Sequence, residues 1–164
     1  MSGTIETMNQ WRYNLFDNRP MMLAEQTVAQ SVPNNTFTKI TFTTLLYDNF
    51  GGYSTGLSTY TVQLAGIYRV SGQIQWTANA TPARFIRVLH NGTSTGLLSV
   101  SDNCSADITT SSALTTLVSC SIGDTLVIQG DQNSGVALNT QAGAAGGINY
   151  NSWFTAVWLR PQET

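Results

Sequence analysis

A chain of 164 residues is long enough for one domain with its own core, and charged residues make up only 10% of it, against the usual quarter. A net charge of −2 and a single Lys do not supply the clustered positive charge of a nucleic-acid surface, so nucleic acid is not an expected partner. No apolar run reaches the roughly 20 residues of a membrane span, and the segment MSGTIETMNQ lacks the apolar core of a secretory signal. We therefore expect a protein that folds in a cytoplasm and leaves it by lysis or assembly.

Residues 1–19 do not show a strand pattern. Trp11, Tyr13, Leu15 and Phe16 alternate loosely with polar residues in a segment without turn glycines after Gly3. The segment is either packed on its own domain or an arm that attaches to a partner, because a few aromatic side chains bury enough area to hold one. We divide the chain into an attachment arm at 1–19 and one domain at 20–164.

Strands are predicted at residues 20–26 and 36–42, with Pro33-Asn34-Asn35 as the turn between them. A glycine-containing loop at 50–58 leads into the most regular stretch, residues 59–76. Apolar and polar residues alternate there on both sides of Ala65-Gly66, which is typical of half-buried strands, and we expect a hairpin. One face of its second half is expected in the core: Tyr68, Val70, Gly72, Ile74 and Trp76.

A strand at 84–90 ends in Asn91-Gly92, a strong hairpin signal because both residues tolerate positive φ. His90 is the only histidine, and beside a turn it is most simply a polar strand end. A short strand is predicted at 97–100, followed by a polar loop at 101–107.

Two strands around Gly123-Asp124 are predicted at 113–130, and residues 131–151 form a long loop of small and polar residues, a length that is typical of functional or mobile loops. The last strand, 153–159, carries apolar residues on both faces. Phe154, Ala156 and Trp158 share one face, and Trp153, Val157 and Leu159 share the other.

Cys104 and Cys120 are expected to be free thiols under reducing conditions, with Cys120 in the core because it lies in phase with Val118. No C-x-x-C motif or His/Cys cluster is present along the sequence, which does not favour a zinc site. Asp102, Asn103 and Asp107 could flank a calcium ion, although solvated surface loops have the same composition. No other cofactor is expected.

Four segments resemble, in order, the globular head of complement component one, subcomponent q (complement-q), whose jelly roll is also that of tumour necrosis factor. In the run from Tyr60 to Val70, Gly66 and Tyr68 match the family signature, whereas Gln63 stands at its preferred Pro and Val70 at its preferred Phe.

The other three matches are the strand ending in Asn91-Gly92, the Gly-Asp turn between aliphatic strands, and the closing strand. In the closing strand Thr155 stands for Ser, Ala156 for Gly and Trp158 for Leu. The earlier stretch from Val28 to Asp48 also resembles the family's first strands, in which FTKITF precedes an aromatic-Asp pair, here Tyr47-Asp48. With this stretch the resemblance covers roughly residues 20–161.

The resemblance implies an all-β jelly-roll sandwich of two antiparallel sheets, preceded by the short arm. It also implies a homotrimer, since strands that are apolar on both faces need a cover for the second face, and in this family two other subunits provide it. Four residues are expected at the trimer interface or in the core: Tyr68, Phe154, Val157 and Trp158.

Enzyme activity is the least supported class, because no activated nucleophile, carboxylate pair or metal shell is evident. The opening Arg19-Pro20-Met21 before a complement-like domain resembles phage structural proteins. We therefore expect a non-enzymatic virion protein of a tailed bacteriophage, made in the host cytoplasm: a capsid decoration or head fibre that contacts other virion proteins through the arm.

Three alternatives stay open. The protein could be the receptor-binding tip or a minor tail protein that recognises a host surface glycan, or a bacterial surface adhesin, although no collagen-like stalk is present. A secreted signalling ligand is disfavoured by the missing signal and stalk.

Overall fold

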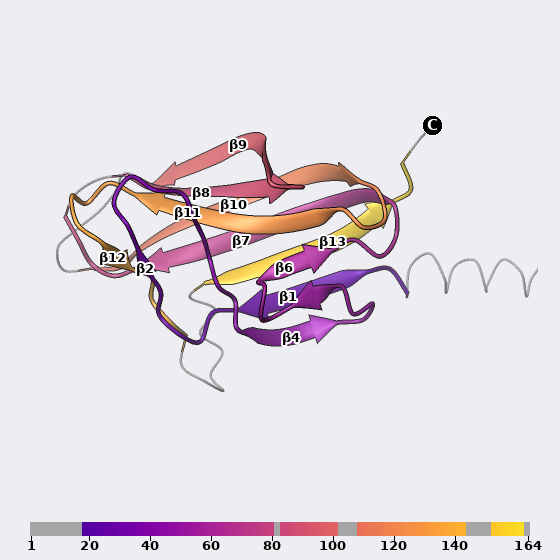
Figure 1. Cartoon of the computed structure of the whole chain (residues 1–164), viewed down its shortest axis with the longest axis horizontal. Helices are drawn as coiled ribbons and strands as arrows, with labels where there is room; N and C mark the ends of the chain where they lie inside the picture. Colours follow the sequence, from indigo (N-terminus) through magenta and orange to yellow (C-terminus); the bar gives the residue numbers. More distant parts are fainter. Residues whose placement is uncertain (1–17, 81–82, 102–107, 144–151, 163–164) are drawn as a thin grey trace, which may run out of the picture.

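Two antiparallel sheets face each other as a sandwich in the computed structural model, which describes residues 18–80, 83–101, 108–143 and 152–162 (Figure 1). Thirteen strands and no helix occur in these ranges. The arrangement confirms the expected all-β class with two antiparallel sheets.

The five-stranded sheet has the spatial order β10 (Thr110–Cys120), β7 (Gly66–Trp76), β13 (Trp153–Arg160), β1 (Met21–Glu25) and β4 (Thr44–Asp48). The six-stranded sheet has the order β5 (Tyr53–Ser54), β6 (Thr59–Thr61), β11 (Thr125–Gln132), β8 (Arg84–His90) and β9 (Thr93–Ser101), with β3 (Thr38–Lys39) paired to β11. A small third ladder joins β2 (Ser31–Val32) and β12 (Leu138–Asn139).

The core lies between the two large sheets, and β7 forms much of one wall. The side-chain alternation expected along β7 is confirmed, because all five residues from Tyr68 to Trp76 that share its core face are buried. Tyr68 packs against Tyr60 of the opposite sheet, with ring centroids 6.0 Å apart. Two glycines let isoleucines of the facing sheet approach closely: a Cβ on Gly72 would lie 3.0 Å from Ile128, and one on Gly130 2.7 Å from Ile74.

The hairpin expected across residues 59–76 is wrong. β6 pairs with β5 and β11 in the six-stranded sheet, whereas β7 pairs with β10 and β13 in the other. The chain between them crosses from one sheet to the other, which leaves Leu64 partly exposed. The physical reason is that alternation reports which face of a strand is buried and carries no information about its partner.

The hairpin at Asn91-Gly92 is confirmed. β8 has the expected bounds and pairs antiparallel with β9, and the two turn residues have φ values of 50° and 77°. Strand β9 begins at Thr93 and is longer than the short strand predicted at 97–100.

Several short strands differ from the predictions. The strand expected at 36–42 is reduced to β3. Just after β3, the Ile40 backbone N–H still donates a hydrogen bond to the Ile128 carbonyl of β11. Strands β2 and β4 were not predicted, β5 lies within the expected loop 50–58, and β12 lies within the expected loop 131–151. The closing strand is confirmed as β13, with Phe154, Ala156 and Trp158 all buried.

Candidate functional site

The face of the five-stranded sheet that points away from the core, here called the outer face, has little charge. The strand register places its side chains in three rows across β4, β1, β13, β7 and β10. The rows are Met21, Val157, Arg69 and Leu117; Tyr47, Leu23, Thr155, Ser71 and Thr115; and Thr44, Glu25, Trp153, Gln73 and Ala113. Arg69 and Glu25 are the only charged residues in these rows, so the outer face is suited to contact another protein surface.

A second surface, this one without charged residues in its strands, lies at the edge of the sandwich where β9 ends one sheet and β10 ends the other. Strand β10 contacts both β9 and β8 across this edge. Neither edge strand contains a charged residue, although strand edges are commonly protected by charge. Its exposed apolar side chains are Leu97, Leu98, Val100 and Leu117, of which Leu117 is the most exposed at 62%. We call this surface the open edge.

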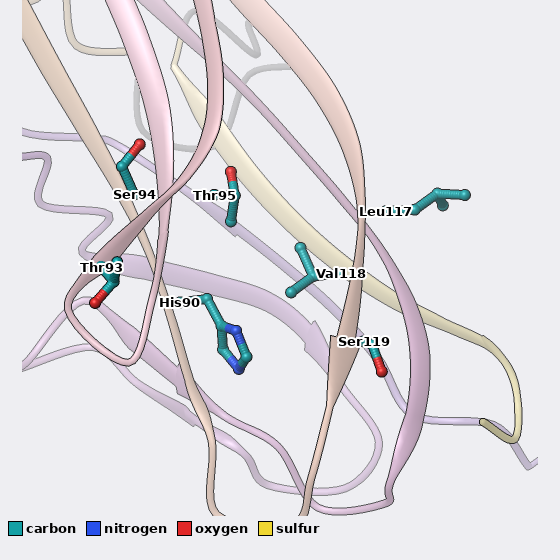
Figure 2. Close-up of a pocket in the computed structure, with 7 residues that line it drawn as sticks. All are labelled: His90, Thr93, Ser94, Thr95, Leu117, Val118 and Ser119. Atoms are coloured by element: carbon teal, nitrogen blue, oxygen red, sulfur yellow. The ribbon is translucent and has the colours of Figure 1, made fainter. Parts of the chain in front are cut away.

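A pocket of about 280 Å³ opens at the open edge (Figure 2). One side is formed by the end of the β8–β9 hairpin and the other by β10. Its lining residues are His90, Thr93, Ser94, Thr95, Leu117, Val118 and Ser119. The pocket is therefore bordered by hydroxyl groups, one imidazole and two aliphatic side chains.

Behind the pocket, a carboxylate joins the β8–β9 hairpin to the β10–β11 turn. Asp124 accepts hydrogen bonds from His90 Nε2 at 2.7 Å, from the Asn91 side-chain amide at 2.7 Å and from the Ser121 backbone N–H at 2.8 Å. These donors favour the charged carboxylate, with the Asn91 bond the largest cause, and they lower the pKa of Asp124 from 3.8 to about 2. Because Asp124 is ionised, His90 Nε2 carries the proton in this bond.

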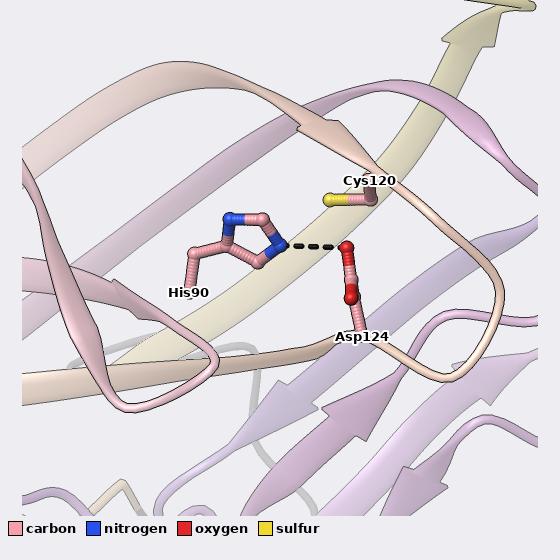
Figure 3. A group of neighbouring side chains, drawn as sticks. All are labelled: His90, Cys120 and Asp124. Carbon is pink, nitrogen blue, oxygen red and sulfur yellow. Dashed lines mark hydrogen bonds and ion pairs between the residues drawn. The ribbon is translucent and has the colours of Figure 1, made fainter.

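Cys120 lies beside this pair, at the end of β10, and only 1% of its surface is exposed. Burial, and then the nearby charge of Asp124, raises the pKa of its thiol to about 12. His90 is thus a neighbour of Cys120 and Asp124 in the fold although it lies far from both along the sequence (Figure 3).

The residues predicted for the trimer interface or core separate onto two faces. Tyr68, Phe154 and Trp158 lie in the core, and Val157 lies on the outer face. Whether Val157 contacts another subunit stays a prediction.

Two other sets of predicted site residues lie outside the described residues. These are the arm residues Trp11, Tyr13, Leu15 and Phe16, and the calcium candidates Asp102, Asn103 and Asp107. Within the described ranges no helix is long and apolar enough to cross a membrane.

Sequence reasoning missed the cluster of His90, Cys120 and Asp124, because it treated His90 as an isolated strand end. The available signal was that His90 directly precedes the Asn91-Gly92 turn and that Asp124 is part of the Gly123-Asp124 turn. Both side chains need a hydrogen-bond partner. A turn that precedes β11 and a turn that follows β8 must lie at the same end of the sheet when these strands pair antiparallel.

Three solved structures that share this architecture cover most of the chain. The globular domain of zebrafish complement 1qA protein has a TM-score of 0.66 and 10% identity, and the match covers 88% of this chain and 100% of that one. Murine APRIL at pH 5.0 has a TM-score of 0.65 and 14% identity, covering 86% and 99% of the two chains. Eiger TNF from S. frugiperda has a TM-score of 0.64 and 12% identity, covering 89% and 96%.

No family model and no curated protein matches the chain. At identities of 10–14% the likeness concerns the course of the backbone. The chain has the jelly-roll fold of the complement-q globular head and the tumour necrosis factor proteins.

Proposed function

We propose that this chain is a non-enzymatic structural protein of a tailed-bacteriophage virion, a homotrimeric capsid decoration or head fibre that exposes a jelly-roll head. The observation that carries the assembly part of the proposal is the pair of surfaces with little or no charge: the outer face, whose three rows contain only Arg69 and Glu25 as charged residues, and the open edge, whose two edge strands contain none. The virion part is supported by the aromatic residues of the arm and by Arg19-Pro20-Met21 before a complement-like domain, which resembles phage structural proteins.

Two different surfaces on one chain fit a head-to-tail assembly. If the open edge of one copy packs on the outer face of the next, each copy uses both surfaces, and a rotation that closes the ring leaves neither exposed. Domains with this fold typically form homotrimers, which favours three copies. Leu117 belongs to both surfaces, because it lies on the outer face of the edge strand β10.

The assembly is tested by the oligomeric state of the chain and of two matched variants. Leu117→Asp places a charge on the residue that the outer face and the open edge of one copy share. We expect this variant to raise the dissociation constant of the trimer at least about tenfold. Ile122→Asp is the control, because Ile122 is 68% exposed and lies in the turn after β10, outside both surfaces. Sedimentation equilibrium should show a trimer for the unchanged chain and for Ile122→Asp. A stable monomer at micromolar concentration in the unchanged chain would refute the proposal.

A non-enzymatic role agrees with how the single imidazole is used. His90 Nε2 hydrogen-bonds to Asp124, and no hydroxyl or thiol among the described residues hydrogen-bonds to this ring. The solved structures of similar fold are ligand-binding or structural proteins. The proposal therefore assigns no catalytic step to this chain.

Attachment to the particle is assigned to the arm, residues 1–19. The domain is fixed where the arm joins it: Asn49 donates to the Arg19 carbonyl at 2.8 Å and accepts from Met21 N–H at 2.8 Å, and Trp158 N–H donates to the Pro20 carbonyl at 2.9 Å. A chain that begins at Arg19 retains all of these bonds. Three arms on one trimer would act together on a repeating lattice, which multiplies weak individual contacts.

Removal of residues 1–18 tests the arm. We expect the shortened chain to keep its thermal transition and its trimeric state but to be absent from purified particles. A shortened chain that fails to fold would instead place the arm in the domain's own core. Imaging of whole particles then locates the trimer: density at the capsid symmetry axes supports decoration, and density at the tail tip selects the receptor-binding alternative.

A further inference from the structure

Three potential metal ligands come together at one end of the sandwich. His90 is the last residue of β8, Cys120 is the last residue of β10, and Asp124 directly precedes β11. An imidazole nitrogen, the thiol sulfur and a carboxylate oxygen all lie within 4.8 Å of one another. Figure 3 shows the Cys120 sulfur pointing toward the hydrogen-bonded His90–Asp124 pair.

The carboxylate of Asp124 is held in place independently of His90. Asn91 donates to its Oδ1 and the Ser121 N–H donates to its Oδ2, while Asn91 Oδ1 accepts from the Thr125 N–H at 2.8 Å. If the His90 bond were exchanged for a metal bond, both donors would remain on Asp124. Such outer hydrogen bonds orient a metal ligand and raise its affinity.

The ligand types select the metal. A nitrogen, a sulfur and one oxygen suit Zn²⁺, whereas Ca²⁺ and Mg²⁺ prefer sets of oxygen ligands. Bond lengths of about 2.0–2.3 Å place tetrahedral ligands roughly 3.3–3.7 Å apart. The His90–Asp124 pair would have to open from 2.7 Å by less than about 1 Å. The Cys120 sulfur, which lies within 4.8 Å of the other two ligand atoms, would have to approach them by at most roughly 1.3 Å.

We propose that His90, Cys120 and Asp124 form a Zn²⁺ site, with the three side chains as ligands and water in the fourth position. The neutral imidazole binds through the Nε2 lone pair, so the proton that Nε2 donates to Asp124 is carried by Nδ1 instead. The Cys120 thiol loses its proton to solvent and binds as the thiolate. Each zinc ion bound to a neutral imidazole therefore releases one proton, and the site gains a net charge of +1 from the ion and the thiolate.

The ion would join two turns that lie next to the open edge. It would connect the end of β8, where the Asn91-Gly92 turn begins, to the Gly123-Asp124 turn, and the imidazole that binds it also borders the pocket. The inference rests on these side chains alone and holds wherever the protein is located in a particle.

The test uses the full-length chain without a histidine tag, stripped with chelator and titrated with zinc alone. We expect one zinc ion per chain and a higher melting temperature in its presence, since an ion that binds only the folded state stabilises it. His90→Gln and Cys120→Ala should each weaken zinc binding at least about tenfold. Cys104→Ala is the matched control, because it removes the other thiol and should bind zinc like the unchanged chain.

Cobalt(II) gives a readout that a purely structural role of Cys120 would not change. Thiolate coordination produces a charge-transfer absorption, which should be present in the unchanged chain and in Cys104→Ala and absent in Cys120→Ala. If Cys120→Ala does not fold, the single histidine provides the second measurement, because zinc should shift the Nε2 resonance of His90. Absence of zinc binding, a thiolate band that persists without Cys120, or an unchanged Nε2 resonance would overturn the proposal.

Discussion

Gly66 allows a close approach that no other residue permits. It is the first residue of β7, has φ of +154°, and a Cβ there would collide with the Trp158 indole nitrogen and the Arg160 carbonyl oxygen. The Trp158 indole N–H donates to the Ala65 carbonyl at 3.1 Å, so the ring cannot move away without losing this bond. Gly66→Ala therefore combines overpacking, backbone strain and a weakened hydrogen bond.

These effects predict a loss of about 3–5 kcal/mol in the free energy of unfolding. For a domain of this size each kcal/mol corresponds to roughly 2–4 °C in melting temperature, so we expect a decrease of roughly 6–20 °C. Chemical denaturation followed by tryptophan fluorescence measures the effect, with every variant at the same protein concentration because the proposed trimer would contribute to stability.

Two alanine variants separate the causes. Gly123 has φ of +90° with open space around its Cβ position, so Gly123→Ala carries backbone strain alone and should cost about 1–2 kcal/mol. Gly56 has open space and no positive φ, so Gly56→Ala should stay within about 0.5 kcal/mol of the unchanged chain. If Gly66→Ala costs no more than Gly123→Ala, the close approach to Trp158 does not matter and the reasoning fails.

Three further predictions concern the core, the tyrosines and the thiols. Phe154→Ala should lower the free energy of unfolding by about 3–5 kcal/mol because its ring is fully buried. Trp153→Ala, on the outer face of the same strand, should weaken trimerisation more than it lowers the free energy of unfolding of the monomer. Sedimentation and denaturation at low concentration distinguish the two effects, and equal effects on both would contradict the assignment of faces. Burial raises the pKa of Tyr53 from 10.0 to about 12, so above pH 10 the unfolded chain loses this proton first and the free energy of unfolding falls until about pH 12. Tyr53→Phe should reduce the slope of the free energy of unfolding against pH in this range, as measured by denaturation. An unchanged slope would argue against the burial of this hydroxyl. Native Cys120 should react slowly with alkylating agents at mildly alkaline pH, and mass analysis without reductant should find Cys104 and Cys120 both modified once the chain unfolds; a protected pair would reveal a disulfide.

The sequence was most informative where local physics decides the structure. The alternation along β7 and β13 identified their buried faces correctly, and Asn91-Gly92 identified a hairpin because both residues adopt positive φ. Sheet membership follows from long-range pairing, so the same alternation joined β6 to β7 in error. Strands of two residues, such as β2 and β12, are too short for any period to appear.

The candidate site was even less accessible to sequence reasoning. His90 lies 34 positions from Asp124, and only the antiparallel pairing of β8 with β11 brings them to hydrogen-bond distance. The outer face has a similar origin, because its rows combine residues from five strands. What the sequence did indicate was that β13 needs a cover on both faces.

The position of β13 has a consequence for how the molecule is made. This strand comes after all the other described strands in sequence, yet it lies in the middle of the five-stranded sheet, between β7 and β1. Until the ribosome has synthesised β13, β1 and β7 each have one edge that lacks its partner strand. Such unpaired edges are prone to pair with other chains. The sheet can close only after residue 160 leaves the exit tunnel, and contacts between such distant segments make its folding slow.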